Sequence, residues 1–530
     1  MGQPLEARSV VDASAPQDMS VTIYRDPDRD VGDEMNRNWP KGFAMISEVR
    51  TVTLPEGEST IRFEGVAEGM VGVSAIVTGL PGGTIEKNRN AELLSPAALV
   101  NGALGNRVTI TRTNPATGDV QSEQAVVRTR ADGGLVLQSS QGFEAVRCAG
   151  LPEKLTFDGV SDGLSAKPIF SIDTATPGGG TYEVTLTYLA WGFDWQANYV
   201  ATMGEKKDGD EFQLSLLSWL TLLNDNDQSF NNAKLQIIAG TLNVDSDYQE
   251  LSDPPVARPL RLTCYPFGST AAGSAIPPPP PPPGRSTPKA MMAMADGAIM
   301  VTGSRMRREA LQEAPVSVSV VTAEEENLGD LKLFRVPDRV DVSAKGLKQV
   351  AFINKEEVKA RFLYTAGCDP WTWIGELGEP ESAEMLLVTK NEEKKGLGIA
   401  LPQGALNLFE PTSFGTQLAA TTELRDYARG QDVELEIGNS AQVFAKCARL
   451  GEDDEDRLEG GKWTKMQANL TNANPHPVKM RLELGWSGDW NIRFPRNKVQ
   501  VKNGYEIVEV TIPANSERKF VWRLRDTERD

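Results

Sequence analysis

Most of the chain alternates between apolar and polar positions, which is the pattern of half-buried β-strands. Arg107–Thr113 alternate in this way, and so do Thr181–Tyr188, which follow a run of glycines. Near the C-terminus, Tyr505–Ile512 and Arg518–Arg525 also read as strands. The number of such segments predicts a chain that is built mainly of sheets.

Short turn signals separate many of these strands. Asp132-Gly133 stands between Gln124–Arg130 and Leu135–Gln138, and Asn503-Gly504 stands between Lys498–Val501 and the following strand. Both residues of such a pair tolerate a positive φ, so each pair favours a two-residue type I′ hairpin. Antiparallel neighbours are expected at both places.

Signals for helices are few. Ser95 and Pro96 precede an Ala- and Leu-rich segment that ends near Gly105. Ser at the N-cap, Pro at the first helical position and Gly beyond the end are typical helix boundaries. A single helical turn is also predicted at Ala323–Leu328. The expected fold class is all-β, with several antiparallel β-sandwich-like domains and few short helices.

A run of seven prolines, Pro277–Pro283, interrupts the chain near its middle. Proline fixes φ and lacks an amide donor, so the run predicts an extended polyproline spacer. A stretch with Met291, Met292 and Met294 follows. Thioethers are ligands for a soft metal such as copper(I), but no His or Cys stands nearby, so a flexible apolar linker is the simpler interpretation.

The domain organisation follows from these interruptions and from the length of 530 residues, which corresponds to about three to four domains of roughly 100–200 residues. The acidic segment Glu452–Asp456 predicts a solvated loop rather than a calcium site. The expected parts are a flexible N-terminus (1–16), an N-terminal β domain (17–150), a second β domain (151–270), a Pro/Met-rich tether with a strand-like segment (271–322), a third β domain (323–405) and a C-terminal β-sandwich (406–530).

The composition supports folded domains and restricts the partners. Hydrophobic residues make up 40% of the chain, so extensive disorder is not expected. The formal net charge is −18, which argues against nucleic acid and anionic membranes, because both require a positive face. No apolar run in the sequence approaches the ~20 residues of a transmembrane helix.

The cysteines and the single histidine limit metal and redox chemistry. No CxxC pair occurs, and the four cysteines lie far apart, so zinc-site spacing is absent; they are Cys148, Cys264, Cys368 and Cys447. Two disulfides, with three possible connectivities, and buried free thiols are both open. His476 stands between two prolines, which favours a turn. We expect neither a metal nor a cofactor.

Three tryptophan clusters are the candidates for carbohydrate binding. An aromatic ring presents an apolar face on which a sugar can stack. Glycoside hydrolysis would need two carboxyl groups nearby, but nothing in the sequence selects a pair, and packing between sheets is the simpler interpretation. The candidate stacking residues are Trp191 and Trp195 around Asp194, and Trp486 and Trp490 around Asp489; the third cluster is Asp369-Pro-Trp-Thr-Trp.

Other catalytic motifs are absent from the sequence. There is no GxxxxGK[ST] loop, no GxGxxG that opens a helix after a strand, and no GxSxG elbow. A P-loop enzyme, a dinucleotide-binding fold and an α/β-hydrolase are therefore not expected. The sequence identifies no catalytic residue.

Four blocks of the sequence carry a resemblance to a known family. They are IRFEGVAEGM from Ile61 with SAIVTGLPGG and EKNRN, LTYLAWGFDWQANY from Leu186, NDNDQSFNNAKLQIIAG from Asn224, and NANPHPVKMRLE from Asn472 with IPANSERKFVWRL. Together they resemble the bacterial family called domain of unknown function 4139, whose better-named relatives are the mucoidy-inhibitor-like proteins. The resemblance covers roughly residues 50–270 and 325–530. A heptad coiled-coil insertion, which belongs to the mucoidy-inhibitor pattern, is not seen here.

The resemblance implies β-rich, envelope-associated proteins that are usually made with a signal peptide, and it implies no catalytic residues. The N-terminus MGQPLEAR has no hydrophobic segment typical of a signal peptide. A cytosolic protein and a mature protein in which Met1 replaces the signal are both open. The resemblance favours the second, so the expected location is periplasmic or extracellular, with outer-membrane association as an option.

The segment after the prolines is similar to the N-terminal entry of TonB-dependent outer-membrane receptors. It reads IMVTGSRMRR from Ile299 and APVSVSVVTAEE from Ala314, and no barrel follows. In those receptors, an extended segment pairs with the energising protein by strand addition. Self-pairing of Pro315–Thr322 with the protein's own sheet is the alternative. The similarity implies a partner-binding strand at Val301, Thr302, Gly303, Ser304 and Arg305.

Three functions are compatible with these observations. The preferred one is a non-enzymatic binding or scaffold protein of the cell envelope, with an exposed tether that pairs with a partner. The second is a glycan-active enzyme that uses an Asp/Glu pair beside a tryptophan cluster. The third is a structural, oligomeric surface protein.

Overall fold

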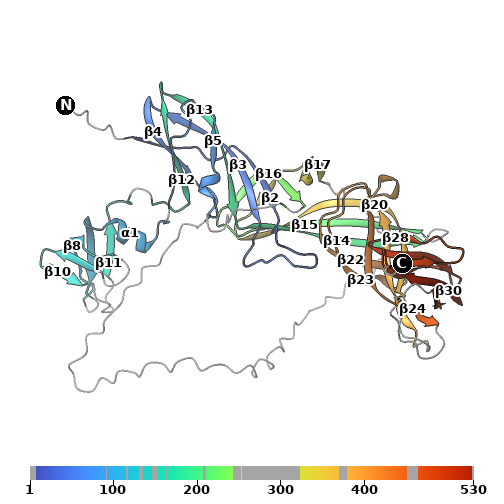
Figure 1. Ribbon diagram of the computed structural model, residues 1–530. Helices are drawn as coiled ribbons and strands as arrows, with labels where there is room; N and C mark the ends of the chain where they lie inside the picture. The colour runs from blue at the N-terminus through green and yellow to red at the C-terminus, as the bar shows by residue number, and fades with distance from the viewer. Residues whose placement is uncertain are drawn as a thin grey trace, which may run out of the picture. The chain divides into compact units, whose positions relative to one another are not determined.

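The computed structural model describes residues 8–90, 92–114, 117–130, 135–145, 153–161, 164–206, 211–240, 242, 252, 323–368, 370, 379–450 and 463–527. These residues lie mostly in strands, which confirms the all-β fold class (Figure 1). The helices of the described ranges are α1 (Pro96–Gly102) and the short 3-10 helices η1 (Gly72–Ser74) and η2 (Glu393–Lys395). None of them is long and apolar enough to cross a membrane.

The chain forms two compact units. Unit 1 lies within Met1–Leu93, Ser165–Val256 and Val320–Asp530, and the described part of unit 2 lies within Leu94–Leu164. Unit 2 is therefore an insertion between two strands of unit 1. Insertions of this kind leave the parent strands paired, because the two ends of the inserted segment return to neighbouring positions.

Unit 2 is a five-stranded antiparallel sheet with the helix α1. The Ser95 hydroxyl accepts a hydrogen bond from the Ala98 amide (3.2 Å), as the sequence predicts for an N-cap. Its core contains Val100 of the helix and alternate residues of the strands, such as Val108 and Ile110. The strand order is β10 (Gly142–Ala145), β9 (Val136–Ser139), β8 (Val120–Val127), β7 (Arg107–Thr113) and β11 (Glu153–Phe157).

Unit 1 contains three sheets, two of which hold its N-terminal half. The four-stranded sheet has the order β1 (Ser9–Asp12), β4 (Gly57–Glu64), β12 (Ile169–Thr176) and β6 (Glu86–Arg89). The eight-stranded sheet runs β17 (Glu324–Leu328), β18 (Leu331–Arg335), β16 (Phe230–Ala239), β2 (Asp18–Tyr24), β3 (Phe43–Leu54), β13 (Gly180–Trp191) and β5 (Ile76–Thr78), with β19 (Val340–Val342) on β16.

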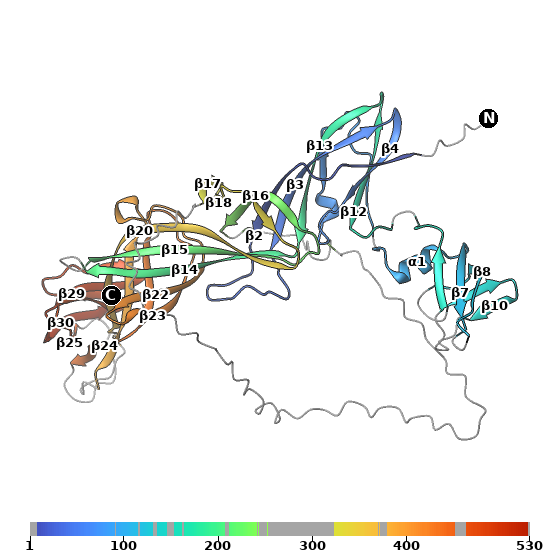
Figure 2. The ribbon, with the colours of Figure 1, turned by 180° about the vertical axis from the view of Figure 1, so that it is seen from behind.

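The third sheet of unit 1 has thirteen strands and combines β14 and β15 with strands that follow residue 345 (Figure 2). Its path is β23 (Gly415–Leu424), β22 (Gly404–Thr412), β14 (Phe193–Lys206), β15 (Glu211–Asn224), β20 (Gly346–Gly367), β21 (Glu381–Lys390), β24 (Asp432–Leu450), β25 (Thr464–Asn472), β30 (Ser516–Asp526) and β27 (Trp490–Arg493). Off this path, β26 (Val478–Trp486) pairs with β20 and β29 (Tyr505–Ile512), and β28 (Gln500–Lys502) pairs with β29.

Strand pairing crosses the domain boundaries that the sequence predicts. β12 and β13 lie beyond residue 150, yet they pair with β4 and β3. β22 spans the predicted boundary at residue 405 and pairs with β14. Ala323–Leu328, the predicted helical turn, instead contains β17, which forms a hairpin with β18. Pairing with distant strands determines the structure at these positions, and the local residue pattern does not reveal which distant strand is the partner.

Most strand pairs are antiparallel, as predicted, but among the described strands four pairs are parallel: β1 with β4, β14 with β22, β16 with β2, and β20 with β26. The predicted hairpin at Asn503-Gly504 is present, with a positive φ at both residues. The predicted hairpin turn at Asp132-Gly133 lies outside the described residues.

A polar corner follows β15 and leads into the eight-stranded sheet. Asn224 ends β15, and its side-chain oxygen accepts a hydrogen bond from the Asn226 amide (3.0 Å). Its side-chain amide donates to the carbonyls of Gln228 (2.9 Å) and Ser343 (3.2 Å). Asn224 and Asn226 are both buried, so these bonds satisfy backbone groups that water does not reach.

The same corner occurs again after β25. Asn472 accepts from the Asn474 amide (2.9 Å) and donates to the carbonyls of His476 (2.9 Å) and Pro513 (2.9 Å). The flanking strands repeat as well. In the first copy, β15 pairs with β20 and β16 pairs with β19. In the second copy, β25 pairs with β30 and β26 pairs with β29. Unit 1 therefore contains the same four-strand arrangement twice.

Three of the four blocks that carry the family resemblance meet at the first corner. Asn226 accepts a hydrogen bond from the Gly69 amide (2.7 Å) and donates to the Trp191 carbonyl (3.0 Å). A Cβ on Gly69 would lie 2.2 Å from that carbonyl oxygen, so only glycine fits. Gly192, with φ +87°, then turns the chain from β13 into β14. The Trp-Gly-Phe-Asp-Trp motif thus marks a change of sheet.

A disulfide joins Cys368, directly after β20, to Cys447 in β24, with a Cα–Cα distance of 5.3 Å. It crosses the second core of unit 1, where Cys368 is fully buried. Cys148 and Cys264 lie outside the described residues. Of the pairings that four cysteines allow, the structure contains the one between Cys368 and Cys447.

We expect the substitutions Asn224→Ala and Asn472→Ala to destabilise the protein by about 3 kcal/mol each, because each removes hydrogen bonds to backbone groups. Asn224→Ala leaves two carbonyls and one amide without these bonds. Asn472→Ala does the same to the His476 carbonyl and the Asn474 amide, whereas the Pro513 carbonyl keeps a bond from Ser516. Urea denaturation followed by circular dichroism measures this as an earlier unfolding midpoint. Asn231→Ala, on the exposed side of β16, is the matched control and should change stability by no more than about 0.5 kcal/mol. Midpoints equal to that of the control would contradict the role of the corners.

Candidate functional site

A long loop, residues 25–42 between β2 and β3, is fixed to the thirteen-stranded sheet (Figure 1). Arg29 forms an ion pair with Asp194 of β14 and donates to the Trp195 carbonyl (2.9 Å). Asp194 also accepts from the amide of Asp26 (3.1 Å). The Arg29 side chain is 6% exposed and that of Asp194 is 1% exposed. This ion pair is therefore shielded from water at the base of the loop.

Burial raises the pKa of Asp194, although Arg29 and two backbone amides favour its ionised form. A buried carboxylate without its arginine would be far less stable, because Arg29 is the cation that compensates its charge. Asp194 thus acts as a structural anchor, and its position next to two tryptophans does not place it in an open site.

Further contacts extend this attachment along the loop. The amide of Met35, a buried residue, donates to the side-chain oxygen of Gln196 (3.1 Å). Arg25, at the start of the loop, forms two hydrogen bonds with Asp426 (3.1 and 2.5 Å). The loop is consequently held against the sheet at three places, and the space between loop and sheet has a defined shape.

The loop and the outer face of the sheet enclose a pocket of about 520 Å³, which we call the loop-covered pocket. This volume is within the roughly 300–1,000 Å³ of small-molecule sites. Its lining residues are Gly32, Glu34, Met35 and Arg37 of the loop and Gln196, Asn198, Thr221, Leu347, Gln349, Ala405 and Glu423 of the strands.

The floor of the loop-covered pocket is a row of neutral polar side chains on three neighbouring strands. Gln196 lies opposite Thr221, and Thr221 lies opposite Gln349, so the three share one face. The side-chain amides of Asn198 (3.1 Å) and Gln349 (3.5 Å) approach the Thr221 hydroxyl. Amides and hydroxyls both donate and accept hydrogen bonds, so this floor suits a ligand that carries many hydroxyl groups.

Trp219 lies one row from the pocket floor. It is directly opposite Asn198 on β14, and it stands two residues before Thr221 on β15. These positions place its ring on the same face as the floor. The side chain is 36% exposed, so part of an aromatic face is open beside the polar row.

Two glutamates and an arginine complete the pocket. Burial raises the pKa of Glu423, and the nearby carboxylate of Glu34 raises it further. Among the described residues, Glu34, Glu423 and Arg37 form no ion pair. A pair of carboxyl groups without a fixed cation therefore faces the ligand space.

The tryptophans predicted as stacking residues lie in different environments. Trp195 is fully buried in the first core of unit 1, and Trp490 is buried in the second, so no sugar reaches either ring. Trp191 is half-buried at the change of sheet. Trp486 is 50% exposed. Sequence proximity grouped these residues, but the two tryptophans of each pair lie on different strands, so the packing of each strand decides the exposure of its own ring.

Several other predicted sites lie outside the described residues. They are the partner-binding strand at Val301, Thr302, Gly303, Ser304 and Arg305, the cluster from Asp369 except Pro370, the methionines Met291, Met292 and Met294, and the acidic segment Glu452–Asp456. His476 lies in an exposed turn between β25 and β26. In the described ranges, no group of three or more His, Cys, Asp or Glu side chains is arranged to hold a metal ion.

The residues of the loop-covered pocket were not predicted from the sequence. Gln196, Asn198 and Thr221 are ordinary polar positions of alternating strands, and no local pattern distinguishes them. One signal was available: residues 25–42 form a long polar segment with a single tryptophan between the alternating segments that form β2 and β3. Loops of that length within a compact domain are commonly functional.

The sequence was compared with protein-family models and with curated proteins, and neither comparison gives a match. The resemblance to the family called domain of unknown function 4139 therefore stays a prediction.

We expect Arg29→Gln to release the loop from the sheet, because it leaves the buried Asp194 carboxylate uncompensated at a cost of about 3–5 kcal/mol. Trypsin cleavage after Arg37 and Lys41, both exposed in the loop, should accelerate at least about tenfold. Arg339→Gln removes an exposed ion pair with Asp18 and is the matched control. An unchanged cleavage rate in Arg29→Gln would show that the ion pair does not hold the loop.

Proposed function

We propose that this protein is a non-enzymatic binding protein of the bacterial cell envelope that binds carbohydrate in the loop-covered pocket. The observation that carries the proposal is the row of neutral amide and hydroxyl groups beside the partly exposed ring of Trp219. Sugars combine hydroxyl groups with apolar ring faces, and a site of this composition offers partners to both.

The proposed location has two supports. The Cys368–Cys447 disulfide is typical of proteins that fold in oxidising compartments. The family resemblance implies envelope-associated proteins. We therefore propose a periplasmic or extracellular location, where polysaccharides are available as ligands.

The tether stays part of the proposal. Its predicted partner-binding strand, residues 301–305, would add to the sheet edge of another envelope protein. This role rests on the sequence similarity to TonB-dependent receptors alone. It is separate from the carbohydrate site, which uses residues of unit 1 only.

A second candidate function follows from Glu34 and Glu423. Glycoside hydrolases use one carboxyl group with a raised pKa as the general acid and a second carboxylate as base or nucleophile. Glu423, whose pKa is raised by burial and by Glu34, has the character of such an acid. The same pocket would then cleave the carbohydrate that it binds.

For carbohydrate binding, we expect neutral oligosaccharides to bind the full chain in isothermal titration calorimetry. Trp219→Ala and Asn198→Ala should each weaken the affinity about tenfold, because each removes a contact worth about 1.4 kcal/mol. Phe414→Ala removes an aromatic ring that is 94% exposed at the tip of the β22–β23 hairpin, and it should leave the affinity unchanged. A panel of glucose-, galactose- and mannose-based oligosaccharides without any binding would refute the proposal.

For hydrolysis, release of reducing ends from the same oligosaccharides is the measurement. If the second candidate is right, Glu423→Gln lowers the rate by about 10²–10⁴-fold while the affinity is retained. Glu410→Gln, at an exposed position of β22, is the matched control and keeps the wild-type rate. Absence of turnover in the wild-type protein under conditions of saturated binding would leave only the binding function.

A further inference from the structure

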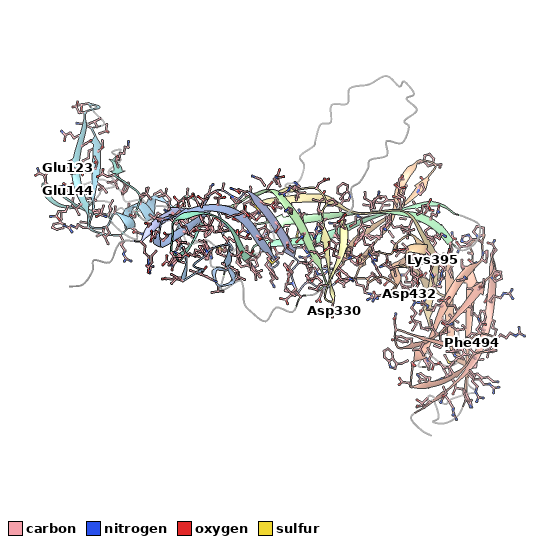
Figure 3. All side chains as sticks on the ribbon, turned by 90° about the horizontal axis from the view of Figure 1, so that it is seen from above. Glu123, Glu144, Asp330, Lys395, Asp432 and Phe494 are labelled. Atoms are coloured by element: carbon pink, nitrogen blue, oxygen red, sulfur yellow. A yellow bond between two sulfur atoms is a disulfide. The ribbon has the colours of Figure 1, made fainter. Side chains whose placement is uncertain are left out.

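A second pocket of about 480 Å³ lies at the other end of β15 and β20, and we call it the charged pocket. It is formed by strands β15, β20, β21, β24, β26, β28 and β29 and by η2. Figure 3 labels two of its residues, Lys395 and Asp432. Six of its lining residues are cationic and four are anionic: Lys359, Arg361, Lys390, Lys395, Arg481 and Lys502 against Glu211, Asp432, Glu434 and Glu509.

The charged pocket therefore has an excess of two positive charges, six minus four, although the whole chain has a net charge of −18. The central ion pair consists of Arg481 and Glu434, which form two hydrogen bonds (2.8 and 2.7 Å). Burial alone would raise the pKa of Glu434, but hydrogen bonds from Arg481 and Lys502 outweigh it and lower the pKa to about 2. These residues neutralise one another and form the rigid floor.

The least compensated cations of the pocket are two side chains of β20, Arg361 and Lys359. The nearest carboxylate oxygen to Arg361, in Glu509, is 3.8 Å from Nη2, which is beyond hydrogen-bond distance. The Nη1 of Arg361 is buried and has no hydrogen-bond partner. Lys359, two residues earlier on the same strand, forms no ion pair among the described residues. A buried guanidinium nitrogen without an acceptor is costly, and an anionic ligand would supply the acceptor that Nη1 of Arg361 lacks.

An exposed aromatic pair adjoins the charged pocket. Lys502, which lines the pocket, lies directly opposite Tyr505 on β29, and Tyr505 lies directly opposite Trp486 on β26. The three side chains therefore form a row on one face of the sheet. The rings of Trp486 and Tyr505 are 5.0 Å apart and nearly perpendicular, and they are 50% and 39% exposed.

The ring of Trp486 is held in place from below. A Cβ on Gly504 would lie only 2.5 Å from its six-membered ring, so the ring rests directly on the backbone of that glycine. Its orientation is fixed while half of its surface is open. A fixed, exposed aromatic face is the form of surface on which a sugar ring stacks.

The distance between the Trp486–Tyr505 pair and Arg361 of the charged pocket sets the size of the ligand. Tyr505 and Glu509 are four residues apart on β29, which corresponds to about 13 Å along an extended strand. Ile507 lies between them and lines the charged pocket. A ligand that reaches from Trp486 to Arg361 is thus longer than a single sugar and corresponds to a short oligosaccharide.

We propose that the charged pocket and the Trp486–Tyr505 pair form a second binding site, which takes an acidic oligosaccharide with a carboxylate on one sugar. The carboxylate pairs with Arg361 and Lys359, and a neighbouring sugar ring stacks on Trp486. This site shares no lining residue with the loop-covered pocket, so it does not rest on the function proposed above.

The test is isothermal titration of the full chain with three probes: an oligosaccharide of glucuronic acid, a glucose oligosaccharide of the same length, and inorganic sulfate. At this site the acidic oligosaccharide should bind at least about tenfold more tightly than the glucose oligosaccharide or sulfate, because only it meets both the cations and the aromatic face. Arg361→Gln and Trp486→Ala should each weaken its binding about tenfold or more, and Trp486→Phe should retain most of it.

Three control variants make the outcome specific. Arg107→Gln removes an exposed arginine of unit 2, Phe414→Ala removes an exposed ring at the tip of the β22–β23 hairpin, and Lys359→Gln removes an exposed charge of the pocket. The first two should leave the affinity for the acidic oligosaccharide unchanged, and the third should lower it. Wild-type affinity for the acidic oligosaccharide in Arg361→Gln or Trp486→Ala would overturn the proposal. An equal loss of affinity for the glucose oligosaccharide in Arg361→Gln would also overturn it, because neutral sugars are expected in the loop-covered pocket and only a charge-dependent loss belongs to this site. Sulfate binding as tight as that of the acidic oligosaccharide would also overturn it, because it would reduce the site to an anion pocket.

Discussion

The pairing requirement of β15 determines most of this structure. Its fourteen residues (Glu211–Asn224) bury Leu220 and Leu222, and its backbone groups need partners on both sides because water does not reach them. One partner, β14, precedes it directly, but the other, β20, begins only at Gly346. The chain therefore has to return to the same sheet after the proline-rich segment. Both pockets lie on these strands, so the return of β20 creates both of them: Gln349 lies at one end of it and Arg361 at the other.

Local signals in the sequence were sufficient for individual elements. The alternation at Arg107–Thr113 and Tyr505–Ile512 predicted β7 and β29 with correct ends, and Ser95-Pro96 predicted the start of α1. In each case the residues that decide the structure are neighbours in the chain. The insertion of unit 2 was not predicted, because β4 and β12 pair across it and neither strand has a feature that identifies its distant partner. Domain boundaries drawn along the sequence fail where a sheet recruits strands from several segments.

The candidate sites were beyond prediction for the same reason. The loop-covered pocket depends on Arg29 and Asp194, which are 165 residues apart, and its floor combines single residues from β14, β15 and β20. The tryptophans attracted attention because they are rare and clustered, yet Trp195 is a core residue, whereas Trp219, outside every cluster, is partly exposed beside the pocket. Trp486 is the exception, since it ends β26 beside the hairpin turn at Asn503-Gly504 and its ring is half exposed there. Residue type indicates what a side chain can bind, and register decides whether a ligand can reach it.

The repeated corner separates what the fold requires from what is available for function. Asn224 and Asn472 make equivalent hydrogen bonds, and β15 with β20 corresponds to β25 with β30. When the two strands are aligned at Asn224 and Asn472, Trp219 of β15 takes the same place as Gln467 of β25. Thr221 of β15 takes the same place as Asn469 of β25. The side-chain amide of Gln467 donates to Asn469 (2.9 Å), so the second copy uses these positions to satisfy its own polar groups. If the corner alone determined which residue types occupy these positions, the two copies would carry similar residues there. The open ring of Trp219 and the polar row under the loop are therefore additions to the scaffold, which is the expected character of a binding site.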